Sequence, residues 1–239
     1  MKLINVAIAG LLVCGCAKMG GKKENSSDMT SDSKKSASAM DAGWRDKFDV
    51  EAEDLRPTGN NPWLTIQPGR VQKMKHGIDT LTITILPQTQ TINGIKCGVL
   101  EERETSHGQL EEVSRNFFAT DAETGDVYYL GEDVDVYKNG KIVNHESEWH
   151  AGEKGARMGL MIPAKPKVGD KFYQEIAPKV AMDRVEVVAI DEPLTTPAGT
   201  FKCLHLKETT PLESEVSHKW YAPGIGMVKD DEFELAEKP

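Results

Sequence analysis

Several features that would point to a common function are scarce in this chain of 239 residues. It has no long apolar run beyond its N-terminus, aromatic residues make up only 6% of it, and no segment shows a convincing helical period. Its formal net charge of -9 leaves no basic stripe of the kind that binds phosphate groups. These absences argue against a helical bundle and against nucleic acid or an anionic lipid surface as a partner.

Motifs of the common enzyme classes are also missing. The chain has no Gly-x-Ser-x-Gly, no His-Glu-x-x-His, no Walker loop and no dinucleotide-binding fingerprint. A catalytic site would have to be assembled by tertiary folding from a nucleophile and one of the histidines, and no spacing in the sequence supports that. We therefore expect that the protein is not an enzyme.

The N-terminus has the pattern of an export signal. Lys2 is followed by an apolar run from Leu3 to Val13, which is shorter than the roughly 20 residues of a membrane-spanning helix. Its end, VCGC, resembles a bacterial lipobox, in which a small residue precedes the cysteine that is lipidated and becomes the mature N-terminus. We expect a lipoprotein signal peptide over residues 1–15 and a fatty acyl (palmitate) anchor on Cys16. An ordinary cleaved signal that ends in cysteine is the alternative.

Residue 17 predicts the subcellular location of the protein. By resemblance to Gram-negative lipoproteins, a residue other than aspartate after the lipidated cysteine, here Ala17, implies sorting to the outer membrane. The protein is then expected at the cell envelope. Its N-terminal lipid would attach it to the membrane, and it would face the periplasm or the cell surface.

A change of composition predicts where folding begins. Residues 16–58 are rich in Lys, Ser, Asp and Gly and contain KKENSSDMTSDSKKSASAM, which has no apolar periodicity. Such a segment cannot bury enough apolar surface to fold, so we expect a disordered tether there. The folded β domain is expected over residues 59–239.

The folded part reads as β-structure throughout. In LTITIL, at 81–86, β-branched and apolar residues alternate with threonine, which predicts a half-buried strand. The stretch from Tyr128 to His150 predicts one long hairpin, because Asn139-Gly140 suits a two-residue turn with positive φ at both positions. Pairing through this turn would place Val136 opposite Val143.

The chain repeats itself internally. IKCGVLEE at 95–102 matches FKCLHLKE at 201–208, and VSRNFFA at 113–119 matches VSHKWYA at 216–222. Matches that recur in the same order indicate a duplication. The predicted halves are about 66–127 and 168–231, joined by the central hairpin at 128–150. Each half would be a curved antiparallel meander with one apolar face, so the two should close on each other as a sandwich, a clam or an incomplete barrel, with room for an apolar cavity.

One face of the hairpin is acidic. The predicted register places Asp133 opposite Glu146, and like charges in that position repel each other. Oxygen-rich clusters suit Ca²⁺ or Mg²⁺, so this face is a candidate cation site; a solvated face that prevents edge-to-edge aggregation is the alternative. The candidate ligands are Asp133, Asp135, Glu146, Glu148 and His150.

Cys97 and Cys203 occupy matching places in the two halves. If Cys14 leaves with the signal and Cys16 is acylated, these two cysteines remain in a compartment where disulfides persist. They are expected either to form a bridge or to act as two small buried apolar residues.

Long segments between Asn61 and Lys229 resemble an uncharacterised family of secreted bacterial proteins and lipoproteins. That resemblance implies no activity. The ending PAGTF followed by WYAPGIGMVK is also similar to envelope proteins with a half-barrel fold that carry lipoproteins or lipids, which implies an apolar or lipid ligand. The segments that carry the family resemblance are NPWLTIQPG, GEDVDVYKNGKIVNHESEW, MIPAKPKVGDKFYQE, TTPAGTFKCLHLKETTPLE and WYAPGIGMVK.

Taken together, these observations predict a lipid-anchored envelope protein that is a non-enzymatic ligand-binding module with an apolar cavity. A structural or interaction lipoprotein with a solid core is one alternative. A β protein that binds a divalent cation is the other.

Overall fold

The computed structural model describes residues 43–145 and 147–239, so the signal and the anchor at Cys16 lie outside the described residues. In this part the helical content is a single 3-10 turn, η1 (Ala52–Asp54), and none of it could cross a bilayer as a helix. The strands are β1 (Leu55–Arg56), β2 (Gly59–Asn60), β3 (Thr65–Ile66), β4 (Val71–His76), β5 (Asp79–Ile92), β6 (Ile95–Ser106), β7 (Gln109–Asp121), β8 (Val127–Lys138), β9 (Lys141–Asn144), β10 (Trp149–His150), β11 (Arg157–Ile162), β12 (Lys171–Tyr173), β13 (Glu175–Ile176), β14 (Arg184–Thr196), β15 (Gly199–Thr209), β16 (Val216–Ala222), β17 (Gly226–Asp230) and β18 (Phe233–Leu235).

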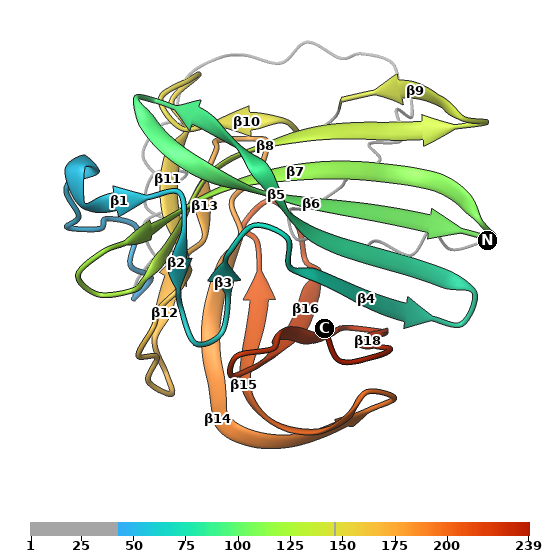
Figure 1. Cartoon of the computed structure of the whole chain (residues 1–239). Coiled ribbons are helices and arrows are strands. Elements are labelled where there is room, and N and C mark those ends of the chain that lie inside the picture. The colour runs from blue at the N-terminus through green and yellow to red at the C-terminus, as the bar shows by residue number, and fades with distance from the viewer. Residues whose placement is uncertain (1–42, 146) are drawn as a thin grey trace, which may run out of the picture.

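Sixteen of these strands form one antiparallel sheet that curves around a single core (Figure 1). The strand order is β12-β14-β15-β16-β17-β18-β4-β5-β6-β7-β8-β11-β13, with β1, β9 and β10 attached beside β7 and β8. The predicted alternation in LTITIL is confirmed, since Leu81, Ile83 and Ile85 are 2%, 5% and 5% exposed. The all-β prediction is confirmed as well.

The sheet almost closes on itself. Its two end strands, β12 and β13, are neighbours in the chain on either side of Gln174, and they pair with β14 and β11. Gly159 of β11 packs against this short segment, where an added Cβ would lie 2.3 Å from the Gln174 carbonyl oxygen, so a side chain there would clash with backbone. The result is a nearly closed barrel with an unsealed seam.

The two halves of the repeat have the same backbone pattern. In the first, the Gly69 N–H donates to the Ile85 carbonyl at 2.8 Å, and in the second the Gly169 N–H donates to the Val187 carbonyl at 2.9 Å. Both glycines have φ near +90°, which glycine adopts without strain. The five strands β4, β5, β6, β7 and β8 of the first half thus correspond to β12, β14, β15, β16 and β17 of the second. The two halves lie side by side in the sheet, because β18, which follows β17, pairs with β4.

The fold begins earlier than residue 59, which corrects the predicted boundary. Leu55 and Arg56 form β1 and pair with β7, and the Arg45 N–H donates to the Lys171 carbonyl at 3.0 Å. Phe48 packs edge-on against Tyr128, with ring centroids 5.8 Å apart. Single aromatic side chains anchor this segment, so it shows no apolar period in the sequence.

The central hairpin has its predicted turn but a different register. Asn139 and Gly140 have positive φ, and Lys138 pairs with Lys141 as expected. A bulge then shifts the pairing, so that Val136 lies opposite Asn144 and not Val143. The predicted register is therefore wrong beyond the first residues. A bulge inserts an extra residue into one strand, and alternation alone gives no sign of it.

Candidate functional site

The acidic hairpin residues have basic partners, one of which, Arg115, was not in the predicted set. Asp133 Oδ1 lies 2.8 Å from His150 Nε2, and Asp135 lies 3.0 Å from the Arg115 guanidinium and 3.1 Å from His145 Nδ1. Arg115 comes from β7, which runs beside β8. These contacts offset the repulsion that motivated the cation site.

The two glutamates of the predicted cation site do not complete a cluster in the structure. Glu146 lies outside the described residues, and Glu148 Oε1 lies 3.2 Å from His145 Nδ1. Within residues 43–145 and 147–239, no group of three or more His, Cys, Asp or Glu is arranged to hold a metal ion. A Ca²⁺ or Mg²⁺ site on this face stays a prediction.

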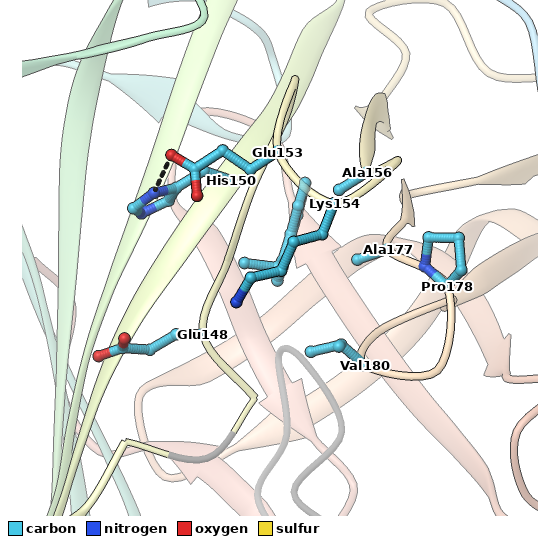
Figure 2. A pocket seen from close by; sticks show the side chains of 9 residues that line it. Glu148, His150, Glu153, Lys154, Ala156, Ala177, Pro178 and Val180 are labelled. Atoms are coloured by element: carbon cyan, nitrogen blue, oxygen red, sulfur yellow. Dashed lines mark ion pairs between the residues drawn. The ribbon is translucent and has the colours of Figure 1, made fainter.

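Two of those residues, Glu148 and His150, instead line a pocket near the seam, called here the seam pocket (Figure 2). Its volume is about 140 Å³. In Figure 2 the acidic side chains and His150 lie on one side, the loop that follows β13 lies on the other, and Lys154 extends between them. The lining residues are Glu148, Trp149, His150, Glu153, Lys154, Ala156, Ala177, Pro178 and Val180.

Two tight turns form the walls of the seam pocket. In the first, the Gly152 N–H donates to the Ala156 carbonyl at 2.9 Å, with Gly152 at φ +91°. In the second, Ala177 and Ala181 exchange hydrogen bonds of 2.7 and 3.0 Å. Both walls are thus closed by their own backbone hydrogen bonds.

Trp149, one of the residues that line the seam pocket, has a buried side chain. Trp149 is 5% exposed, and its ring meets Tyr129 edge-on with centroids 5.1 Å apart. Its Nε1–H is buried and has no hydrogen-bond partner among the described residues. A buried donor without a partner costs about 1–3 kcal/mol.

The barrel interior is filled by side chains around a small void. This void lies beside Leu64, Phe118 and Met227 and measures about 10 Å³. That is about the space that one water molecule needs. An acyl chain does not fit there, so the apolar cavity expected inside the barrel is not found at this place.

The interior also contains charged side chains at repeated positions, which we call the buried triads. In the first copy the triad is on β6, β7 and β8, and in the second it is on β15, β16 and β17. The pairing is the same in both: Asn116 lies opposite Glu132, and Lys219 lies opposite Asp230. The two triads are Glu102, Asn116 and Glu132, and Glu208, Lys219 and Asp230.

The second triad contains its own cation. Lys219 is 1% exposed, and its Nζ donates to the two oxygens of Glu208 at 2.8 and 2.9 Å. Burial alone would lower the pKa of Lys219, but Glu208 and Asp230 outweigh this effect and hold that pKa well above its ordinary value. Burial raises the pKa of Asp230 to about 7 although Lys219 opposes the shift.

The first triad has no cation. Burial, together with the charge of Asp230, raises the pKa of Glu102 to about 8, although Lys219 of the second triad opposes the shift. Burial also raises the pKa of Glu132 well above its ordinary value. One oxygen of each carboxyl is buried without a hydrogen-bond partner among the described residues, and Asn116 accepts a 2.5 Å hydrogen bond from the Tyr129 hydroxyl.

Cys97 and Cys203 are separate thiols in the structure, and both are 0% exposed. Burial raises the pKa of Cys97 to about 12 and that of Cys203 to about 11. Thiols with such pKa values are unreactive at neutral pH, because the thiolate is the nucleophile. In this structure they act as small buried residues, the second of the two expectations.

Comparisons with known proteins give limited likenesses. A family model described as DUF3108-like matches residues 174–238, which covers most of the second copy of the repeat. A solved structure of a "putative lipoprotein" from Parabacteroides distasonis is 15% identical, covers 77% of this chain and all of that one, and has a TM-score of 0.36. A search of the curated proteins found no match.

Proposed function

We propose that the protein is a non-enzymatic, lipid-anchored protein of the cell envelope that binds a small ligand, or a side chain of a partner, in the seam pocket. The observation that carries this proposal is the pocket itself. Two turns, each closed by its own backbone hydrogen bonds, form its walls, and Trp149, Ala156, Ala177, Pro178 and Val180 give it an apolar lining. The sequence ending in Cys16 supports the anchor. Ala17 supports a location at the outer membrane in a Gram-negative cell.

The dimensions of the seam pocket define the ligand. An apolar cavity of about 150 Å³ binds benzene, so a pocket of this size takes one ring or a short branched chain and not a whole lipid. Glu148, Glu153 and Lys154 at the rim suit a polar substituent that stays in water.

The second candidate is a structural or interaction module that binds no small ligand. The filled interior favours it, since a void of about 10 Å³ leaves the barrel solid at that point. The two candidates differ in what the purified protein carries with it.

Filling the seam pocket should displace its ligand. Val180 is 38% exposed and lines the pocket, so Val180→Trp can place an indole in it without entering the core. Native mass spectrometry of protein purified from cells should show a bound small molecule on the wild type and none on Val180→Trp.

Val143→Trp is the matched control, because Val143 is 54% exposed on β9 and does not line the pocket. It should keep the ligand. A wild type that carries nothing, while both variants fold, would favour the solid interaction module.

The anchor is tested separately. Cys16→Ala should abolish metabolic labelling with a radioactive fatty acid and move the protein out of the membrane fraction, because the acylated thiol would be gone. Cys14→Ala should leave labelling intact, since Cys14 is expected to leave with the signal. Unchanged labelling and fractionation in Cys16→Ala would remove the lipoprotein assignment.

A further inference from the structure

A short extended segment lies beside the seam of the barrel, and we call this segment, residues 43–50, the strap. The side chains of residues 44, 46, 48 and 50 are partly buried against the barrel, and those of the odd-numbered residues between them are exposed. Such alternation is the pattern of an extended chain with one buried face. The strap therefore binds to the barrel in the way that a strand binds to a sheet.

The strap pairs with the outer edge of β12, an end strand of the sheet. The Arg45 N–H donates to the Lys171 carbonyl, and the Tyr173 N–H donates to the Arg45 carbonyl, both at 3.0 Å. These two bonds form a parallel bridge. An edge strand offers N–H and C=O groups that an added extended chain can use, and here the strap uses them.

The side chains on the buried face of the strap have separate contacts on the barrel. The Trp44 ring lies against the Arg184 guanidinium, with its centroid 4.6 Å from Cζ. Arg157 donates to the Asp46 carbonyl at 3.1 Å and to its carboxylate at 3.3 Å. Phe48 packs on β8. Because these contacts come from β14, β11 and β8, the strap connects the two ends of the sheet.

The strap is held by contacts that allow exchange. Its pairing with β12 is an isolated bridge. The side chains of Arg157 and Asp46 are 49% and 48% exposed, and ion pairs in water contribute little to stability. Residues 51–54 separate the strap from Leu55, where pairing with β7 begins, so the strap can leave the barrel while β1 stays paired.

The contacts around the strap are basic, although the chain has a net charge of -9. Lys171 Nζ lies 5.5 Å from the centroid of the Trp44 ring, whose other cation is Arg184, and Arg157 binds Asp46. Cations beside an aromatic ring and a guanidinium on a carboxylate recognise a segment that has aromatic and acidic side chains.

We propose that this surface, called here the strap site, binds an extended segment of a partner protein, and that the strap is its built-in occupant, which the partner displaces. The partner segment has an aromatic, an acidic and an aromatic residue at alternate positions, as residues 44, 46 and 48 do. This inference is independent of the seam pocket. The residues of the strap site are Tyr128, Arg157, Lys171, Tyr173 and Arg184.

A labelled peptide with the sequence of residues 43–51, GWRDKFDVE, is the probe, and its fluorescence anisotropy reports binding to the full-length protein. The double variant Trp44→Ala with Phe48→Ala removes the aromatic contacts of the strap. We expect it to bind the peptide about tenfold more tightly than the wild type or better, because the intact strap competes for the site. Asp46→Ala, which keeps both aromatic contacts, should give a smaller gain and serves if the double variant does not fold.

Phe201→Ala is the matched control. Phe201 is a partly buried aromatic residue of β15 whose ring lies beside Lys238, so its loss should leave peptide binding as in the wild type. A peptide with alanine in place of its tryptophan and phenylalanine should not bind the double variant. Equal binding of the two peptides, or no binding to either strap variant, would overturn the proposal.

Native mass spectrometry distinguishes a partner from a second copy of this chain. The wild type should be a monomer. A dimer that the double variant loses would show that the strap of a second copy occupies the site, and it would overturn the assignment to a different protein.

Discussion

Replacing Lys219 with methionine is expected to lower the free energy of unfolding by about 3–5 kcal/mol. Methionine fills a similar volume, so the loss is electrostatic: Glu208, which is 5% exposed and bonded to Nζ through both oxygens, would be left as an uncompensated buried charge. Urea denaturation at pH 7.5 measures the change. The slope of the transition should stay constant, because the exposed surface on unfolding does not change.

Two controls separate the charge from the packing. The double variant Lys219→Met with Glu208→Gln should recover most of the loss, because the remaining buried group is neutral. Lys229→Met removes the more exposed pair with Glu234, at 2.8 Å, and should cost less than about 1 kcal/mol. If Lys219→Met cost no more than Lys229→Met, the buried pair would not be a major stabilising contact.

The stability of the protein is expected to fall as the pH rises from about 5 to about 8. The pKa of Glu102 is about 8 in the folded protein and 4.5 in an ordinary setting, so between these values the folded state binds more protons than the unfolded state. The free energy of unfolding then decreases with rising pH. At about 1.4 kcal/mol per unit, this one group accounts for at most roughly 5 kcal/mol.

Other groups around Glu102 act in the same direction. Burial raises the pKa of Glu104 to about 8 and that of Glu112 to about 7, and Asp230 behaves likewise. The positive charge of Lys219 lowers the pKa of Glu102 and so opposes this effect. Urea denaturation at several pH values from 5 to 9 gives the free energy of unfolding at each pH. This free energy should depend less on pH in Glu102→Gln than in the wild type, and the variant should be the more stable protein above pH 8. Identical pH profiles would contradict the proton uptake of Glu102.

Much of the fold could be predicted because its signals are local. Leu81, Ile83 and Ile85 alternate with threonine, and Asn139-Gly140 marks a turn, so period and turn chemistry predict strands and a hairpin. The duplication was visible because matching residues recur in order. Register was not predictable beyond the turn, since alternation gives no sign of the bulge that leaves Val143 of β9 without a partner residue on β8.

The buried triads were missed although the sequence held a signal for them. Alternation carries Leu204 and Leu206 inward, and the same parity places Glu208 inside. Its repeat partner Glu102 follows Leu100 in the same way. Charged residues normally lie at the surface, so alternation alone does not predict that Glu102 and Glu208 are buried. Arg115, a basic partner of Asp135, comes from the neighbouring strand β7, which a single hairpin does not reveal.

Fusing two copies in one chain has a consequence for symmetry. In a homodimer of identical halves, every substitution would appear twice, related by the two-fold axis, so both interior sites would hold a lysine or both would hold an asparagine. A single chain has no such constraint. One half of this barrel therefore keeps a buried lysine bonded to its carboxylate, and the other half has an asparagine in the matching place, a difference that an exact two-fold axis forbids.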